Sequence, residues 1–199
     1  MDTYNVFPDK PITPSGQVSQ QFLRLGIDTF LGACRHVQGL PYGYNANRDD
    51  LMILFKEKMG SCTTKHAVIA TLAAELDLPI QKSIGLYAMT DAIVTGTDRI
   101  LTKYRLPYLP MVHCFLVYDA FRVDLTEGNA NGKNRPIDDL LHAEPVIANI
   151  SAKVEYLKYR QALQRTILTR SEFAGITIKT LLLAREEGLE LLKANVKQN

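Results

Sequence analysis

Apolar residues recur at helical spacing through most of the first 80 positions of the chain. The stretch 20–37 is the first to show this spacing, and it predicts one helix. The preceding residues 1–17 hold three prolines and a glycine, which predict an extended arm or loop. A proline, two glycines and two tyrosines interrupt the helical spacing over 39–45 and predict a loop there.

Two further helices are predicted before the pattern changes. Asp49 and Asp50 stand where a second helix would begin, because acidic side chains favour the positive end of the helix dipole. Gly60 ends this helix. A third helix begins at Cys62 with apolar residues at helical spacing, and it ends with Leu78-Pro79 because proline cannot continue a helix.

Beyond residue 80 the pattern is typical of strands. Three segments are rich in β-branched and aromatic residues: 80–89, 111–118 and 121–126. Asp119-Ala120 suits a tight two-residue connection between the last two of them. The irregular composition of 90–110 and 127–136 predicts loops, of which the first would lie over a cleft. From 151 to 199 the chain is helical in character, in two segments that separate near 169–175.

The composition describes an ordinary globular protein. Of the 199 residues, 46% are hydrophobic and 22% are charged, which indicates a single domain with a sizeable core. We predict a core over 1–150, with 1–17 as its arm, and a helical segment over 151–199 packed on that core. The net charge of +2 is too small to favour nucleic acid as a partner, and no apolar run is long enough for a membrane span.

The cysteines are odd in number and lack paired spacing: Cys34, Cys62 and Cys114. This pattern favours free thiols in a reducing, cytoplasmic compartment over a disulfide framework. The sequence contains neither a CxxC nor an HExxH pattern, so it predicts no metal site and no cofactor.

Cys62 is the strongest candidate for chemistry. Gly60-Ser61 leads directly into the third helix, so the Cys62 thiol lies in its first turn. The unpaired N–H groups and the positive dipole end there favour a thiolate, the form that attacks acyl carbons. An inert cysteine that only packs at the helix start is the alternative interpretation.

A cysteine nucleophile needs a base and a third group that orients the base. Among four histidines, His113 is the best placed, because it begins a strand segment. A two-residue turn after that strand would pair Phe115 with Asp124. Asp124 is then a diagonal neighbour of His113 on the same sheet face, about 7–8 Å away. The spacing therefore predicts a triad of Cys62, His113 and Asp124.

Other interpretations of these residues stay open. His66 lies one helical turn after Cys62 and could contact the thiol, although so close a pair leaves little room for a substrate carbonyl. Cys114 alternates to the opposite strand face from His113 and is expected to be a small buried hydrophobe. Asp124 could instead anchor backbone amides at the turn.

In their order and spacing these residues resemble the transglutaminase-like superfamily of papain-like cysteine enzymes. That family has a G-x-C motif that opens a helix, an H-x-aromatic strand, and D-P-T at the end of the next strand. The corresponding segments here are Gly60-Ser61-Cys62, His113-Cys114-Phe115 and Asp124-Leu125-Thr126, and the similarity covers roughly 40–126. The chain departs from the family in having no tryptophan and in carrying Leu125 in place of the proline.

The resemblance implies an α+β fold with a papain/transglutaminase-like core, in which the nucleophile-bearing helix packs on an antiparallel β-sheet, with extra C-terminal helices. It implies acyl transfer through a Cys62 thioester, with His113 moving the proton and Asp124 holding the imidazole. The Cys62 N–H would be the first oxyanion donor. Candidates for the second donor come from the upstream loop: Tyr42, Tyr44 and Gln38.

The leading interpretation is a thiol hydrolase, either a peptidase or an amidase, with a peptide or amide substrate. The first alternative is a protein-glutamine or amine acyltransferase. An alternative of another class is a non-catalytic binding protein that retains the fold. The leucines within 181–192 are numerous enough to pack the C-terminal helices on the core, and a homodimer contact is the other use for them.

Overall fold

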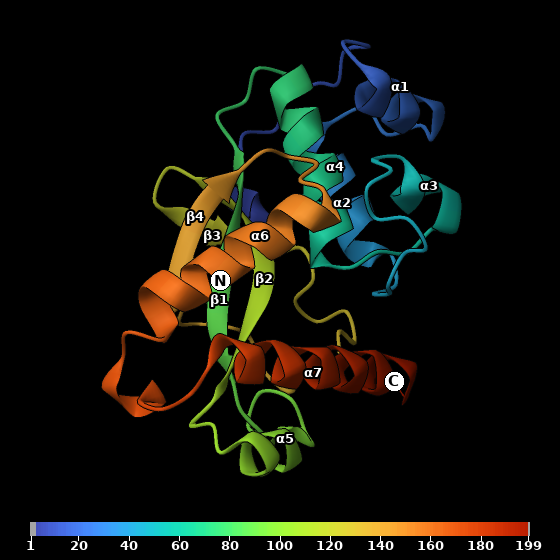
Figure 1. Cartoon of the computed structure of the whole chain (residues 1–199). Helices are drawn as coiled ribbons and strands as arrows, with labels where there is room; N and C mark the ends of the chain where they lie inside the picture. The colour runs from blue at the N-terminus through green and yellow to red at the C-terminus, as the bar shows by residue number, and fades with distance from the viewer. Residues whose placement is uncertain (1–2, 199) are drawn as a thin grey trace. The chain divides into compact units, whose positions relative to one another are not determined.

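The computed structural model describes residues 3–198 and confirms the mixed α+β class, with 44% helix and 16% strand. Seven α-helices and four strands are formed within that range (Figure 1). The chain divides into two compact units. The first contains the residues up to Ile84 together with Cys114–Asn129 and Pro145–Ser151. The second contains Gly85–His113, Ala130–Glu144 and the residues from Ala152 onwards.

α4 is the central helix of the first unit. The helical segments of this unit are a short 3-10 helix (Tyr4–Val6), α1 (Gln17–Arg24), α2 (Phe30–Gly39), α3 (Ile53–Glu57) and α4 (Cys62–Glu75). α4 contacts each of the other three α-helices (Figure 1). Its residues from Cys62 to Ala70 are all buried, so the first turns of α4 lie in the interior on every side. The predicted start of this helix at Cys62 is confirmed.

The single helix predicted over 20–37 is wrong, because the chain forms α1 and α2 there. Gly26 between them has φ +75°, a left-handed conformation that ends α1. Thr29 then caps α2, with its Oγ1 accepting a hydrogen bond from Gly32 N at 3.1 Å. Helical spacing of the apolar residues persists across the break, and therefore the pattern alone does not reveal it.

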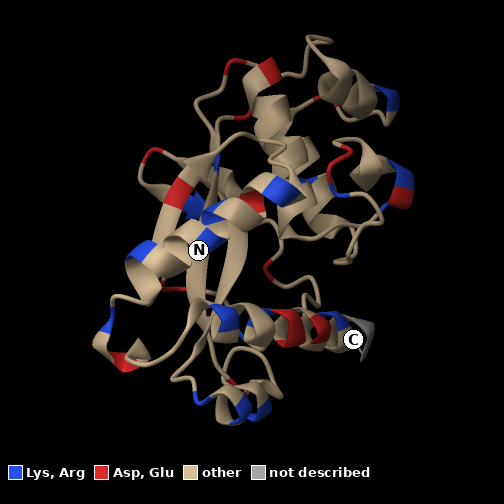
Figure 2. Cartoon of the chain, in the orientation of Figure 1, with Lys and Arg blue, Asp and Glu red and all other residues tan. Residues whose placement is uncertain are grey.

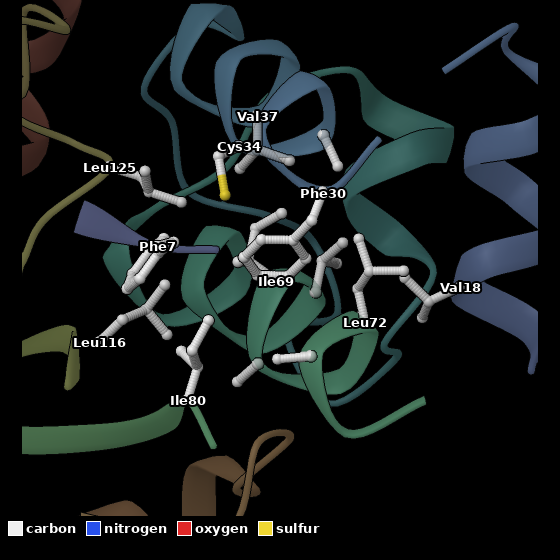
Figure 3. Packing of buried hydrophobic residues seen from close by; sticks show 14 of the residues in the cluster. Phe7, Val18, Phe30, Cys34, Val37, Ile69, Leu72, Ile80, Leu116 and Leu125 are labelled. Carbon is white, nitrogen blue, oxygen red and sulfur yellow. The ribbon is translucent and has the colours of Figure 1, made fainter. Parts of the chain in front are cut away.

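The hydrophobic core of the first unit forms around α4. Figure 3 shows its labelled members: Phe7, Val18, Phe30, Cys34, Val37, Ile69, Leu72, Ile80, Leu116 and Leu125. Phe7 and Ile12 bring the N-terminal arm into this core. Main-chain bonds from Ile12 N to Asp28 O (2.7 Å) and from Phe30 N to Lys10 O (2.9 Å) hold the arm in place. The arm is therefore an integral part of the core.

The strands form one antiparallel sheet in the order β3-β2-β1-β4. Their bounds are β1 Gln81–Met89, β2 Leu109–Tyr118, β3 Phe121–Val123 and β4 His142–Val146. Tyr118 pairs with Phe121 and Leu116 pairs with Val123, which confirms the predicted two-residue turn. Asp119 in that turn has φ +50°, the left-handed conformation that a tight hairpin requires.

Two elements of the structure, α5 and β4, are absent from the sequence prediction. α5 (Thr97–Tyr104) lies within the stretch 90–110 that was predicted to be a loop. It begins after Gly96, whose φ of +96° breaks the chain direction, and its eight residues are too short for a clear helical pattern. β4 is missed because its residues alternate between intermediate and exposed and include Pro145, so it lacks an apolar strand signal.

The C-terminal stretch is helical and broken as predicted. It contains α6 (Ala152–Ala162), a π-helical turn (Leu163–Ile167), a 3-10 turn (Ser171–Phe173) and α7 (Ile178–Gln198). The predicted separation near 169–175 therefore falls within the observed break between the π-helical turn and α7.

The helices of the second unit pack on its parts of β1 and β2. Tyr159 of α6 donates its hydroxyl to Pro110 O at 3.0 Å. α7 approaches so closely that a Cβ at Gly188 would lie 2.7 Å from Leu109 Cδ2. Figure 2 shows acidic and basic residues along α7, and Glu187 there accepts hydrogen bonds from α5. The helices after residue 151 thus group with 85–113 and 130–144, while the proposed dimer contact stays a prediction.

Gly60, which precedes the cysteine, offers a test of the packing at the start of α4. An added Cβ would lie 2.5 Å from Leu54 Cδ1 and 2.6 Å from Thr64 Oγ1, so Gly60→Ala must displace a buried side chain. We expect a loss of about 1–3 kcal/mol in the free energy of unfolding, measured by urea denaturation.

Gly39→Ala is the matched control, because no atom lies within 4 Å of its added Cβ. This variant is expected to be as stable as the wild type or slightly more stable, because alanine favours helix. Equal stability of the two variants would contradict the tight packing around Gly60.

Candidate functional site

Cys62 is the first residue of α4, and the preceding Ser61 is extended, with φ −82° and ψ 177°. The Ser61 carbonyl accepts the first bond of the helix, from Lys65 N at 3.0 Å. The N–H groups of the first turn carry partial positive charge beside the thiol, which favours a thiolate. The Cys62 residue is 8% exposed, so only a small part of it meets solvent.

The loop after α2 lies beside the residues that lead into Cys62. Gly60 N donates to Pro41 O at 3.1 Å, and Gly43 N donates to Gly60 O at 3.3 Å. Tyr42 forms a parallel bridge with Gly60, two residues before the cysteine. The rings of Tyr42 and Tyr44 meet edge to face with centroids 6.0 Å apart. Two of the three predicted oxyanion candidates are therefore in the loop that pairs with Gly60.

The far end of this loop is also bonded to α4. Thr64 Oγ1 donates to Asn45 Oδ1 at 2.7 Å, which joins the loop to the first turn of the helix. Asn45 Nδ2 donates in turn to Glu57 Oε2 at 2.8 Å and to Met59 O at 2.9 Å. Asn45 thus connects the loop to α4 and to the segment that precedes it.

The near end of the loop is held by a buried lysine. Lys65 Nζ donates to Leu40 O at 2.5 Å and to Gln38 O at 3.3 Å. Burial lowers the pKa of Lys65 to about 8, and the charge of Asp124 acts in the opposite direction. Asn129 Nδ2 donates to the same two carbonyls, at 2.5 Å to Gln38 O and 3.0 Å to Leu40 O. Gln38, the third oxyanion candidate, is therefore fixed through its main-chain carbonyl.

Asp124 is buried directly after β3 and bonds to its own turn. Its Oδ1 accepts hydrogen bonds from Thr126 N at 2.8 Å and from Thr126 Oγ1 at 2.6 Å. Asp124 therefore anchors a backbone amide of its turn, which was one of the two roles that the sequence allowed for it. These bonds also fix the orientation of the carboxylate.

His66 binds the same turn from α4. Its Nε2 accepts a hydrogen bond from Leu125 N at 2.8 Å and lies 3.4 Å from Asp124 Oδ1. A ring nitrogen that accepts an N–H carries no proton of its own, so His66 is the neutral tautomer with its proton on Nδ1. Because the Nε2 lone pair accepts the Leu125 N–H, the role of His66 in this structure is to anchor the segment that follows β3.

His113 and Cys114 are neighbours in β2, and the boundary between the two units falls between them. In the second unit, His113 is buried and meets the Tyr87 ring edge to face, with centroids 6.4 Å apart. In the first unit, Cys114 is fully buried, as expected, with its Sγ 3.6 Å from Thr63 Oγ1. Side chains alternate along a strand, so His113 and Cys114 point to opposite faces of the sheet.

Sequence reasoning gave no role to three residues of this site: Lys65, Thr126 and Asn129. Lys65 lies in the mainly apolar stretch that follows Cys62, and a lysine at such a position could have indicated a buried, hydrogen-bonded ammonium group. A threonine two residues after an aspartate is typical of a side chain-bonded turn. Asn129 lies in a polar loop with several other asparagines, so its sequence context does not distinguish it from them.

The chain matches no protein-family model, no curated protein and no solved structure. The transglutaminase-like resemblance therefore stays a prediction that rests on the motif residues. Within residues 3–198, no helix is long and apolar enough to cross a membrane. Over the same residues, no group of three or more His, Cys, Asp or Glu side chains is placed to hold a metal ion.

The anchoring role of His66 is testable by substitution. His66→Leu leaves the buried Leu125 N–H without an acceptor, so we expect a loss of about 1–3 kcal/mol in the free energy of unfolding by urea. His66→Gln offers an amide oxygen near the position of Nε2 and should retain more of the stability. A His66→Leu variant as stable as the wild type would show that the bond to Leu125 contributes nothing.

Proposed function

We propose that this protein is a thiol hydrolase, a peptidase or amidase, that cleaves amide bonds through an acyl thioester on Cys62. The observation that carries the proposal is the position of Cys62 at the first residue of a buried 14-residue helix. The helix dipole and the first-turn N–H groups stabilise a thiolate at this position. The Pro41–Gly43 segment, bonded to Gly60, supplies a fixed wall beside it.

The proposed reaction has two steps. The Cys62 thiolate attacks the amide carbonyl, a C–S bond forms, and the C–N bond breaks as His113 gives its proton to the leaving amine. Water, deprotonated by His113, then attacks the thioester, which releases a carboxylic acid and restores the thiol. Water is the favoured acceptor because it needs no binding site of its own, whereas an acyltransferase needs a second substrate.

The oxyanion of each step requires two donors. The Cys62 N–H is the first. For the second, Tyr42 is favoured over Tyr44 and Gln38, because Tyr42 pairs directly with Gly60. Gln38 is held through its main-chain carbonyl, which accepts two hydrogen bonds, so only its side-chain amide would remain to act as the donor.

Asp124 takes the third role of the triad. Both donors of Thr126 bind Oδ1, which fixes the carboxylate, and we assign to Asp124 the role of orienting the His113 imidazole. A carboxylate in a fixed orientation would hold that imidazole in the tautomer that a base needs.

A papain-like fold of the transglutaminase-like type is part of the proposal. It is supported by one hydrophobic core that contains residues of α4, such as Ile69 and Leu72, together with Leu116 and Val123 of the β2–β3 hairpin. It is also supported by the observed register of that hairpin, which matches the spacing on which the resemblance was based.

The test is the pH dependence of iodoacetamide labelling, located by peptide mass mapping, in the wild type and in His113→Ala. We expect Cys62 to label fast, with a midpoint well below pH ~8.5, the value for a free thiol. His113→Ala should abolish this advantage, because the imidazolium that stabilises the thiolate is lost.

Cys34 provides an internal reference, because burial and the charge of Asp9 raise the pKa of its thiol. His142→Ala is the matched histidine control and should leave the Cys62 profile unchanged. The triad is refuted if Cys62 labels no faster than Cys34 and if His113→Ala leaves the profile unaltered. The non-catalytic binding protein would then be the better interpretation.

A further inference from the structure

Two donors converge on one pair of main-chain carbonyls in the first unit. Each of the carbonyls of Gln38 and Leu40 accepts one hydrogen bond from Lys65 Nζ and one from Asn129 Nδ2. These carbonyls stand at the end of α2 and lead directly into the Pro41–Gly43 segment that pairs with Gly60.

The geometry points to a positioning role for this pair: Lys65 and Asn129 form a clamp that holds the Pro41–Asn45 loop beside Cys62. The inference rests on the proposed function, in which that loop supplies the second oxyanion donor. The clamp acts by positioning the loop, and no part in the reaction itself is assigned to it.

The bonding pattern suits a device that fixes a loop. A carbonyl oxygen has two lone pairs, and each of these carbonyls accepts two donors, so both lone pairs are used. Asn129 Oδ1 is buried with no hydrogen-bond partner among residues 3–198, so the two donor bonds alone orient this amide. Lys65 is 0% exposed, and a buried ammonium is costly unless hydrogen bonds and a nearby charge compensate for it.

Lys82 offers a matched control. It is 1% exposed, and its Nζ also donates to two main-chain carbonyls, Thr63 O at 2.9 Å and Ala148 O at 3.1 Å. Neither carbonyl belongs to the loop. Lys82→Met therefore removes a buried ammonium with two carbonyl acceptors and leaves the clamp intact.

The test compares two reactions of Cys62 in Lys65→Met, Asn129→Leu, Lys82→Met and the wild type. Acylation by p-nitrophenyl acetate passes through a tetrahedral oxyanion and needs the donor from the loop. Alkylation by iodoacetamide displaces iodide from a saturated carbon and forms no oxyanion. We expect acylation to fall about 10–100-fold relative to alkylation in both clamp variants. The ratio of the two rates should keep its wild-type value in Lys82→Met.

Asn129→Leu removes no charge, and its position in a half-buried loop makes it the variant more certain to fold. It carries the test alone if Lys65→Met does not fold. An unchanged ratio of rates in a folded Asn129→Leu variant overturns the positioning role.

Hydrogen exchange gives a readout that does not depend on catalysis. The amides of Gly43 and Gly60 join the loop to the residues before Cys62, so both should exchange faster in the clamp variants than in Lys82→Met. Unchanged exchange at both amides overturns the clamp itself. If exchange responds but wild-type Cys62 reacts slowly with both reagents, the proposed function fails while the clamp stands as a feature of the fold.

Discussion

The buried first turn of α4 is the constraint on which the rest of the first unit depends. Four consecutive polar residues, 63–66, are buried there, and each bonds to a different part of the chain. Thr63 bonds to Cys114 and Lys82, and Thr64 bonds to Asn45. Lys65 donates to the main-chain carbonyls of Gln38 and Leu40. His66 accepts a hydrogen bond from Leu125 N. An unsatisfied buried polar group costs about 1–3 kcal/mol, so these bonds also select a single arrangement of the segments around the helix.

This arrangement supports the proposed activation of the Cys62 thiol. The same bonds that satisfy the turn bring a rigid loop and the end of a strand to the residues around Cys62. A site in which the donors are already in place needs little reorganisation when charge develops on a substrate oxygen. Stability and the proposed chemistry therefore depend on the same few side chains of α4.

Local patterns were enough to predict the start of α4 at Cys62 and the hairpin turn at Asp119-Ala120. Both depend on residues adjacent in sequence. The split of 20–37 into two helices escaped prediction because the apolar spacing continues across Gly26. The roles of Lys65 and His66 escaped it for a different reason. Their partners are tens of residues away in sequence, and only the tertiary fold brings those groups together.

The central claim is that Cys62 exists as a thiolate at the start of α4. The most direct measurement is the ultraviolet absorbance of the thiolate as a function of pH, taken as the difference between the wild type and Cys62→Ser. We predict a step in this difference below neutral pH, because the helix dipole and, in the proposed triad, the His113 imidazolium would stabilise the anion. A difference that stays flat until the pH exceeds about 8.5, where an ordinary thiol ionises, would contradict the account.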